Sequence, residues 1–332
     1  MKFTDRKVLV IGDLILDEYL HGDATRISQE APVPIVRFRK FEYRLGGAGN
    51  VAANIASLGG KVHVIGMIGD DKGGSKLENL FLFSGISWTE SRSWSLRRTT
   101  IKTRIIANGQ QISRVDIEDT DVIGQPTLTN LVSTITREST DACAIVVSDY
   151  AKGVIAPEVM DCVRSCGAAR NIPIFLDPKV RNAAAYRVRR SYPLEFITPN
   201  HHEAEGLNGK SAGVYEIGTN ISARYAAKNV LITRGEHGMT LISHVPNAAM
   251  LCVDIPTAAK EVFDVSGAGD TVIATLALAV ASSYSVEQAA KLANLAAGVV
   301  VGKRGTATVS YAELAAAGGS EICVDDTIPP GL

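Results

Sequence analysis

Six short runs of apolar, mostly β-branched residues recur along this 332-residue chain, and they constrain its fold more than any other feature. Each run is almost continuously apolar, as expected of strands buried on both faces of a parallel sheet. Helix-compatible segments lie between the runs, so strand and helix alternate. We predict strands at Val8–Ile11, Val62–Ile65, Ala144–Ser148, Ile174–Asp177, Phe196–Thr198 and Val230–Thr233, and helices at Asn50–Leu58, Pro157–Arg170, Ser222–Lys228 and Ser285–Val301.

This alternation predicts right-handed βαβ units in an α/β fold, with a doubly wound, mostly parallel sheet flanked by helices. In such sheets, ligands bind beyond the carboxyl ends of the strands. Asp13 and Asp17 follow the first strand and suit the hydroxyls of a sugar, although solvated loop charges are the alternative. The polar residues that follow the runs are Asp13, Asp17, Asp149, Lys152, Lys179, Asn200 and Arg234.

Two segments break the parallel pattern. Residues 34–45 alternate apolar and polar side chains, and residues 99–117 contain Asn108-Gly109 between two β-rich runs, a strong hairpin signal. Alternation suits a sheet with one wet face and one face that covers something. We therefore expect a small antiparallel β-lid from about residues 14–45 and 97–118, with an edge hairpin of no functional role as the alternative.

Composition restricts the partners of the chain. The 34 Lys and Arg residues nearly cancel the 35 Asp and Glu residues, and only 6% of residues are aromatic, so nucleic acid and anionic membranes are not expected partners. Five scattered cysteines give no disulfide framework and no zinc pattern, which favours a reducing cytoplasm. The apolar run 271–281 is about half the length that spans a bilayer. We expect a cytoplasmic protein with one domain over residues 1–317 and a loosely ordered tail over residues 318–332.

The segment Asp264-Val-Ser-Gly-Ala-Gly-Asp270 carries the strongest chemical signal, because it directly precedes the apolar run 271–281. Its glycines allow a ligand to approach the backbone, and the first turn of the next helix favours a negative charge such as a phosphoryl group in transfer. Asp270 is placed to take a proton from an attacking hydroxyl. The alternative is that Asp270 only caps the helix.

A second glycine-rich segment, Gly46-Gly-Ala-Gly-Asn50, opens a predicted helix. It contains G-x-G-x-x-A, and Asp70 lies about twenty residues further on, which imitates a dinucleotide-binding fingerprint. The match is weak because the glycines follow the predicted lid rather than a buried strand. Asn50 is better interpreted as a polar group aimed at a hydroxylated ligand, with a helix cap as the alternative.

Two further turns suit a nucleotide. Asn200-His-His-Glu203 offers oxygen ligands for hydrated Mg²⁺, but it also has the spacing of a capping box. Thr233-Arg-Gly-Glu-His-Gly238 is either a backbone cradle for a nucleotide or a simple hairpin. No complete Walker A loop, protein-kinase signature, hydrolase elbow or HExxH zinc motif is present.

Together, Gly46–Asn50 and Asp264–Asp270 resemble the two signatures of the ribokinase-like (PfkB) carbohydrate kinases, and Asn200-x-x-Glu203 lies between them as in that family. The resemblance covers about residues 6–314. It implies a ribokinase-like fold, an ATP-dependent carbohydrate kinase and Mg²⁺ as cofactor.

Four more motifs narrow the resemblance to family members that phosphorylate D-glycero-D-manno-heptose 7-phosphate at O1, on the route to ADP-heptose and lipopolysaccharide. These motifs are Gly12-Asp-Leu-Ile-Leu-Asp17-Glu-Tyr, Arg26-Ile-Ser-Gln-Glu-Ala-Pro-Val-Pro34, Ser148-Asp-Tyr-Ala-Lys-Gly153 and Asp177-Pro-Lys179. Such kinases are often fused to a nucleotidyltransferase, and we expect the single-function form here. The alternatives are a family kinase for another sugar, sugar phosphate or nucleoside, and a non-catalytic sugar-binding regulator.

The resemblance also implies roles for individual residues. Asp270 corresponds to the catalytic base. Asp264 and Ser266 match a potassium-site loop of some relatives, and whether this chain binds potassium is left open. The other implied roles are the anion hole (Gly267, Ala268, Gly269), the sugar site (Asp17, Gly46, Gly47, Asn50), magnesium and nucleotide phosphate (Asn200, Glu203) and the nucleotide site (Thr233, Gly235, Gly238, Asn294).

A sugar that already carries a phosphate needs basic residues at the far end of its site. Arg104 of the predicted lid, Lys152 and Lys179 are our candidates. The assignment of Arg104 depends on strand register, because a slip of one residue would point it at solvent. Since lids of this family often mediate dimers, we expect a homodimer through the lid, with a sugar phosphate and ATP as the small-molecule partners.

Overall fold

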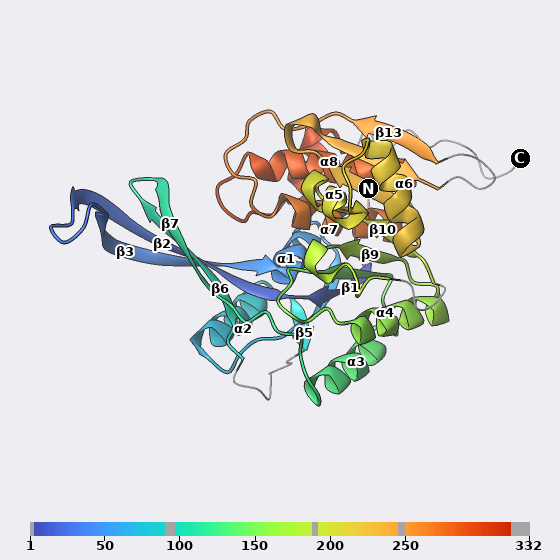
Figure 1. Cartoon of the computed structure of the whole chain (residues 1–332), viewed down its shortest axis with the longest axis horizontal. Helices are drawn as coiled ribbons and strands as arrows, with labels where there is room; N and C mark the ends of the chain where they lie inside the picture. Colours follow the sequence, from blue (N-terminus) through green and yellow to red (C-terminus); the bar gives the residue numbers. More distant parts are fainter. Residues whose placement is uncertain (1–2, 90–96, 188–191, 245–249, 320–332) are drawn as a thin grey trace, which may run out of the picture.

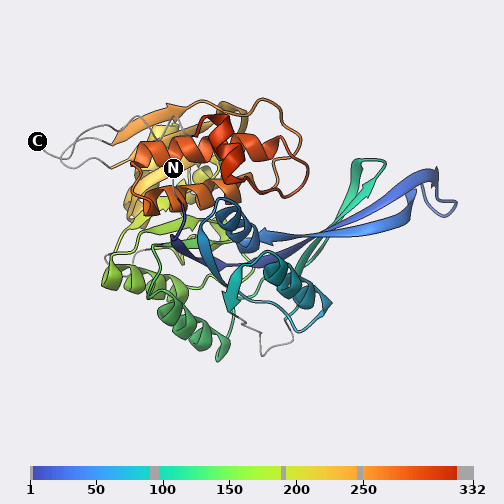
Figure 2. The same ribbon diagram turned by 180° about the vertical axis from the view of Figure 1, so that it is seen from behind.

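The computed structural model describes residues 3–89, 97–187, 192–244 and 250–319, and in these ranges the main body is a nine-stranded sheet with helices on both faces (Figures 1 and 2). From β11 to β5 all neighbouring strands pair in parallel, and β12 and β13 extend the sheet antiparallel. The predicted doubly wound, mostly parallel sheet is confirmed. The strand order is β13 (Leu251–Ile255), β12 (Met239–Ser243), β11 (Ala227–Thr233), β10 (Leu194–Ile197), β9 (Ile174–Asp177), β8 (Ala144–Ser148), β1 (Lys7–Gly12), β4 (Lys61–Ile65) and β5 (Ser87–Thr89).

Successive residues of the buried strands supply two separate cores, which explains why the runs are apolar throughout. Val8 and Val10 of β1 pack into one core, and Leu9 and Ile11 pack into the other. The first core includes α1 (Ala48–Ser57), α2 (Lys72–Phe83), α7 (Ala268–Ala281), α8 (Val286–Val301) and α9 (Tyr311–Leu314); the second includes α3 (Thr127–Glu138), α4 (Pro157–Arg170), α5 (His201–Asn208) and α6 (Val214–Tyr225).

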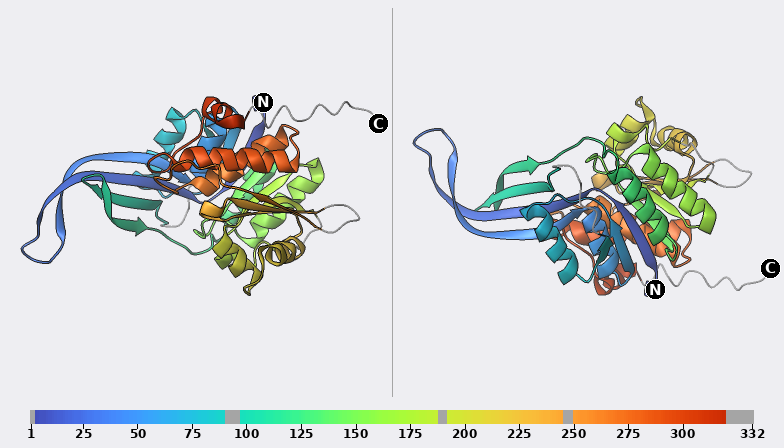
Figure 3. Two further views of the ribbon diagram at one scale, coloured as in Figure 1. Left: turned by 90° about the horizontal axis from the view of Figure 1, so that it is seen from above. Right: turned by 90° about the horizontal axis from the view of Figure 1, so that it is seen from below.

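A second sheet of four described strands forms an arm that projects from the main body, as both views of Figure 3 show. Its order is β3 (Pro34–Gly47), β2 (Leu14–Ile27), β6 (Thr100–Ala107) and β7 (Gln110–Ile117). The outer pairs are antiparallel, whereas the central strands β2 and β6 run parallel. Asn108 and Gly109 both have positive φ, 51° and 82°, as the predicted two-residue hairpin turn requires. We call this sheet the lid.

One predicted helix was wrong. The segment Ser222–Lys228 is not a separate helix: α6 runs from Val214 to Tyr225, and β11 begins at Ala227. Ala226 adopts a left-handed conformation that ends the helix, so the chain turns directly into a strand. Of the predicted tail over residues 318–332, residues 320–332 lie outside the described residues. Within the described ranges, no helix has the length and apolar character needed to cross a membrane.

Candidate active site

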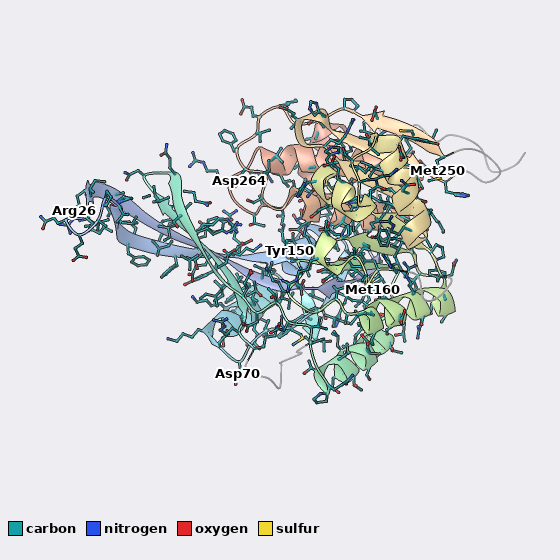
Figure 4. All side chains as sticks on the ribbon, viewed as in Figure 1. Arg26, Asp70, Tyr150, Met160, Met250 and Asp264 are labelled. Carbon is teal, nitrogen blue, oxygen red and sulfur yellow. The ribbon has the colours of Figure 1, made fainter. Side chains whose placement is uncertain are left out.

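The carboxyl ends of the central strands meet the start of α7. The Asp13 N–H donates to the Ser148 carbonyl oxygen at 3.2 Å, which ties the end of β1 to the end of β8. Tyr150, two residues beyond β8, contacts Asp270 in the first turn of α7. In Figure 4, Tyr150 lies where the lid joins the main body. The predicted edge of the sheet is therefore where chemically useful side chains gather.

Asp270 is the central titratable group of this region. Its side chain is buried, and it accepts hydrogen bonds on both oxygens: Asn50 Nδ2 donates to Oδ2 at 2.8 Å, and the Tyr150 hydroxyl donates to Oδ1 at 2.7 Å. Burial raises the pKa of Asp270 from 3.8 to about 6, although these two hydrogen bonds oppose the rise. Asp270 is thus a stronger base than an exposed aspartate and is still ionised at neutral pH.

The alternative interpretation of Asp270 as a helix cap is wrong. The N-cap of α7 is Gly267, which has φ of 79°, and no side chain caps the helix. A Cβ on Gly267 would lie 2.5 Å from Asn50 Nδ2, so glycine is required by conformation and by space. The Ala268 N–H closes the turn by donating to Val265 at 3.2 Å, whereas Gly269 lies in the first turn with open space at its Cβ position.

Gly46 and Gly47 bring the lid and α1 together at the same place. Gly47 is the N-cap of α1 with φ of 57°, and a Cβ on Gly46 would lie 2.5 Å from Asp17 Oδ2. Asn50 is buried and makes no cap, because its amide points at Asp270. Helix α1 follows the lid strand β3 rather than a buried strand, which agrees with the weak weight given to the dinucleotide fingerprint.

Asp17 joins the lid to the C-terminal part of the domain. Arg104 Nη1 donates to Oδ1 at 2.6 Å, and Thr306 Oγ1 donates to Oδ2 at 2.8 Å. In the parallel pairing of β2 with β6, Asp17 lies opposite Lys102 and Tyr19 lies opposite Arg104. These four residues share one face of the lid, which we call the inner face. The register therefore turns Arg104 towards the site and not towards solvent.

The three predicted phosphate-binding cations each have a carboxylate partner. Arg104 pairs with Asp17 at 2.6 Å, and Lys152 Nζ lies 2.6 Å from Glu118 Oε2. Lys179 pairs with Glu203. To bind an anionic ligand, each of these cations would have to leave its carboxylate partner or contact the carboxylate and the ligand together.

Lys102 is a different kind of cation. It is half-buried on the inner face, and its ammonium group forms no ion pair or hydrogen bond with a residue that the structure describes. Its Nζ lies 5.3 Å from the centroid of the Tyr150 ring, and burial lowers the pKa of the ammonium group. Such a group gains more from an anionic ligand than a lysine that is already paired.

Asp13 organises the chain after β8. Its carboxylate is buried and accepts the backbone N–H groups of Tyr150 at 2.8 Å, Lys152 at 3.0 Å and Val154 at 3.2 Å. Burial raises the pKa of Asp13 to about 6 against the effect of these bonds. Because its acceptor positions face the protein backbone, the expected contact with sugar hydroxyls is not supported for Asp13.

Asn200 and Glu203 form the capping box of α5. Asn200 Oδ1 accepts from the Glu203 N–H at 2.9 Å, and Glu203 Oε2 accepts from the Asn200 N–H at 3.0 Å. The described residues contain no cluster of three or more His, Cys, Asp or Glu side chains that could hold a metal ion. Asn200 Oδ1 and both carboxylate oxygens of Glu203 already accept hydrogen bonds from the protein, so Mg²⁺ that keeps most of its water would contact them through that water.

The predicted nucleotide turn lies beside this capping box. Thr233 forms an isolated parallel bridge with Asn200, and the turn Gly235–Gly238 connects β11 to β12 as a hairpin. Of the two interpretations of this turn from the sequence, the hairpin is therefore observed. Asn294 of α8 is buried, and its Nδ2 donates to the Pro256 carbonyl oxygen at 2.8 Å, so part of its hydrogen-bonding capacity is used by the protein.

Asp264 connects two loops. Its Oδ1 accepts from the Ser266 N–H at 2.9 Å, and its Oδ2 accepts from the Gly305 N–H at 3.0 Å. These bonds help to hold the pKa of Asp264 below its ordinary value despite the opposing effect of burial. The predicted potassium-site residues Asp264 and Ser266 are therefore in direct contact.

Sequence reasoning missed Tyr150, Lys102 and Thr306. Tyr150 lies within Ser148–Gly153, a segment singled out for its lysine, and Lys102 shares the strand face of Arg104 two residues away. Both could have been found by considering the side chains next to those chosen. Thr306 lies in no recognised motif, and only the folded chain brings it to Asp17.

The chain is similar in sequence to a known protein family and to individual proteins. Residues 5–313 match the family model described as pfkB family carbohydrate kinase. The chain is 42% identical over 315 residues to the bifunctional protein HldE of Trichlorobacter lovleyi and 41% identical over 316 residues to that of Pseudomonas aeruginosa. Each match covers 94% of this chain but only 62% and 64% of the two relatives.

A solved structure shares the fold. Phosphofructokinase-2 from Escherichia coli, in complex with substrates and products, matches with a TM-score of 0.78 over 96% of this chain and 99% of that protein. The sequence identity is 18%, so the likeness concerns the fold alone.

Proposed function

Because the chain belongs to the pfkB family of carbohydrate kinases, we propose that it transfers the γ-phosphoryl group of ATP to O1 of D-glycero-D-manno-heptose 7-phosphate. The product would be the 1,7-bisphosphate used for ADP-heptose and the lipopolysaccharide core. The observation that carries the proposed chemistry is the buried Asp270 carboxylate held at the start of α7. The four narrowing motifs and the 41–42% identity to the HldE proteins support the choice of acceptor.

In the proposed reaction, Asp270 accepts the proton of the anomeric hydroxyl. O1 then forms a bond to the γ-phosphorus of ATP, and the bond from that phosphorus to the β–γ bridging oxygen breaks, so ADP leaves. The first turn of α7, with Gly267, Ala268 and Gly269, faces the negative charge that develops on the phosphoryl group.

We assign the nucleotide phosphates to the region of Asn200, Glu203 and the Gly235–Gly238 turn, which the bridge between Thr233 and Asn200 brings together. Mg²⁺ bound there would neutralise part of the nucleotide charge. Lys179 is paired with Glu203, and its Nζ lies 5.3 Å from the centroid of the Tyr150 ring. It can therefore supply positive charge between the nucleotide and Asp270.

The 7-phosphate of the acceptor is assigned to the inner face of the lid. Lys102 is the best candidate because it lacks an ion-pair partner among the described residues and lies over Tyr150, next to the base. Arg104 contributes by holding Asp17, which we assign to the sugar hydroxyls together with Gly46, Gly47 and Asn50.

We also propose a cytoplasmic homodimer formed through the lid. The lid and the connection between its strands β2 and β3 expose large apolar side chains that a monomer would leave in water. They include Ile27 (60% exposed), Val33 (51%), Phe38 (52%) and Phe41 (42%). Sedimentation equilibrium of wild-type protein and of Phe38→Asp tests the dimer: we expect the wild-type protein to sediment as a dimer and the variant as a monomer.

The function is tested by coupled ADP release with Mg-ATP. The acceptors are heptose 7-phosphate, ribose, fructose 1-phosphate, fructose 6-phosphate and adenosine. We expect turnover on the heptose alone, and a loss of about a thousandfold in Asp270→Ala with ATP binding retained. Turnover on another acceptor would keep the chemistry and reject the substrate. Bound ATP without turnover on any acceptor would favour a sugar-binding regulator.

A further inference from the structure

Tyr150 makes a contact that none of the proposed roles explains. Its hydroxyl donates to Asp270 Oδ1 at 2.7 Å, while Asn50 Nδ2 donates to Asp270 Oδ2 at 2.8 Å. The two donors come from different segments and hold different oxygens. The plane of the carboxylate is therefore fixed before any acceptor arrives, and each oxygen keeps a further lone pair for an acceptor hydroxyl.

The backbone that carries Tyr150 is itself anchored. Asp13 accepts the N–H groups of Tyr150, Lys152 and Val154, and Asp149 Oδ1 accepts the Ala151 N–H at 2.6 Å. Ala151 has a positive φ of 54°, which these bonds help to maintain. The buried carboxylates of Asp13 and Asp149 thus hold the loop after β8, from which the Tyr150 side chain reaches Asp270.

The Tyr150 ring is placed by two cations. Lys102 Nζ and Lys179 Nζ each lie 5.3 Å from its centroid. Burial and the neighbouring carboxylates raise the pKa of Tyr150 well above its ordinary value of 10. The hydroxyl therefore keeps its proton and donates it in the hydrogen bond to the ionised Asp270 carboxylate.

We propose that Tyr150 is a positioning residue for phosphoryl transfer: its hydroxyl orients the Asp270 carboxylate and stabilises its ionised form. The proposal rests on the proposed role of Asp270 as the base. It assigns Tyr150 no contact with the acceptor or with ATP.

The ionisation of Asp270 depends on several groups around it. Burial raises its pKa to about 6; the hydrogen bonds from Asn50 and Tyr150 lower it, Asp17 of the lid raises it, and Lys179 lowers it. Asp177 at the end of β9 also interacts with Asp270 electrostatically. Of these groups, Tyr150 can be changed to phenylalanine while its ring and its contacts with both lysines are kept.

The test is the pH dependence of kcat/KM for Tyr150→Phe, measured with the acceptor that the wild-type protein turns over. We expect the acid limb of the wild-type profile near pH 6 and that of Tyr150→Phe about one pH unit higher, because the variant loses a donor to the ionised carboxylate. We expect kcat above the limb to fall about tenfold, with the KM for ATP unchanged.

Tyr192→Phe is the matched control. The Tyr192 hydroxyl donates to Asn171 Oδ1 at 3.3 Å, away from Asp270 and from the carboxylates that hold the loop of Tyr150. This variant removes the same atom outside that loop and should leave the acid limb at the wild-type pH. If both variants shift the limb equally, or neither does, Tyr150 has no special effect on the base and the proposal is wrong.

A second substitution keeps the test independent of folding. Site-specific replacement of Tyr150 by 3,5-difluorotyrosine nearly preserves size and makes the hydroxyl a stronger donor, so the acid limb should move to lower pH. An unchanged or raised limb would contradict the proposal. Normal turnover by Asp270→Ala would instead reject the base itself, which separates failure of the proposed function from failure of this inference.

Discussion

Thr306 and Asp17 are hydrogen-bonded across 289 positions of sequence, with Thr306 Oγ1 donating to Asp17 Oδ2 at 2.8 Å. The Thr306 N–H also donates to the Tyr19 hydroxyl at 3.0 Å. A single residue near the end of the domain therefore holds two side chains on the inner face of the lid. This contact connects the position of the lid to the loop that follows α8.

Replacing Thr306 by valine should weaken acceptor binding more than turnover. The change keeps the shape of the side chain but removes the donor to Asp17, and a hydrogen bond to a charged group is worth about 1.5–3 kcal/mol. We expect the KM for the acceptor to rise about tenfold while the KM for ATP stays the same. Steady-state kinetics with each substrate varied in turn measures both.

Thr275→Val is the control for this prediction. Thr275 is buried within α7, and its hydroxyl donates to the Thr271 carbonyl oxygen at 2.8 Å, away from the lid. It should leave both KM values unchanged. An equal rise of acceptor KM in the two variants would show that loss of a buried hydroxyl, and not the contact with Asp17, is responsible.

Lys102→Met should reduce affinity for the phosphate of the acceptor. The ammonium group is half-buried on the inner face, and the structure describes no ion-pair partner for it, so a bound phosphate would be its main compensation. We expect the KM for heptose 7-phosphate to rise at least about tenfold, as for loss of one charged hydrogen bond. The KM for ATP, measured in the same steady-state assays, should not change.

Lys76→Met provides the matched comparison for Lys102. Lys76 belongs to α2 and donates to the Tyr43 hydroxyl at 2.6 Å. In the β2–β3 pairing, Tyr43 lies opposite Glu18, next to Asp17 and hence on the other face of the lid. If Lys76→Met raised the acceptor KM as much as Lys102→Met, the effect would come from general charge and not from a phosphate contact.

The sequence was sufficient for the central parallel strands of the sheet, from β4 to β11, because these strands are buried on both faces, whereas β5, β12 and β13 were not among the predicted strands. Each such strand needs a run of apolar residues, and the runs at β1, β4, β8, β9 and β11 lie within the strands observed. The false helix over Ser222–Lys228 arose because one short segment contains a helix end, a turn and a strand start. Periodicity cannot separate these when the stop signal is Ala226 rather than glycine.

The candidate site was predictable as a set of motifs but not as a set of contacts. Asn50 and Asp270 are 220 positions apart, so no local sequence pattern predicts that the Asn50 amide donates a hydrogen bond to the Asp270 carboxylate. Asp13 resembled a ligand-binding carboxylate in sequence, yet it binds three backbone N–H groups of one loop. Such roles depend on where neighbouring strands end, which is a property of the folded sheet.

Asp270→Asn should change how stability depends on pH. The pKa of Asp270 rises from 3.8 to about 6 on folding, so between these pH values the folded protein binds more protons than the unfolded chain. The contribution of Asp270 to wild-type stability therefore falls as pH rises through this window. The asparagine side chain of the variant does not titrate, so the free energy of unfolding of the variant, minus that of the wild type, should increase by about 3 kcal/mol from about pH 3.5 to about pH 7.5.

Urea unfolding at a series of pH values measures this difference. Asp13, whose pKa is raised to about 6, titrates in both proteins, so its contribution largely cancels in the subtraction. A difference that stays constant with pH would mean that Asp270 is not a buried carboxylate with a raised pKa.

Gly267→Ala and Gly269→Ala should separate the effect of the turn before α7 on stability from its effect on phosphoryl transfer. Gly267 has φ of 79°, and an added Cβ would lie 2.5 Å from Asn50 Nδ2, so alanine strains the backbone and displaces the amide that holds Asp270. We expect Gly267→Ala to lower the free energy of unfolding by about 1–3 kcal/mol and to reduce kcat at least a hundredfold.

Gly269 has nothing within 4 Å of the Cβ position, so Gly269→Ala should unfold like the wild type. If the migrating phosphoryl group occupies that open space, Gly269→Ala will still reduce kcat at least tenfold, because its methyl group keeps the phosphate from the N–H groups of α7. Thermal unfolding and single-turnover kinetics on the two variants measure these effects independently, and full activity in Gly269→Ala would place the phosphoryl group elsewhere.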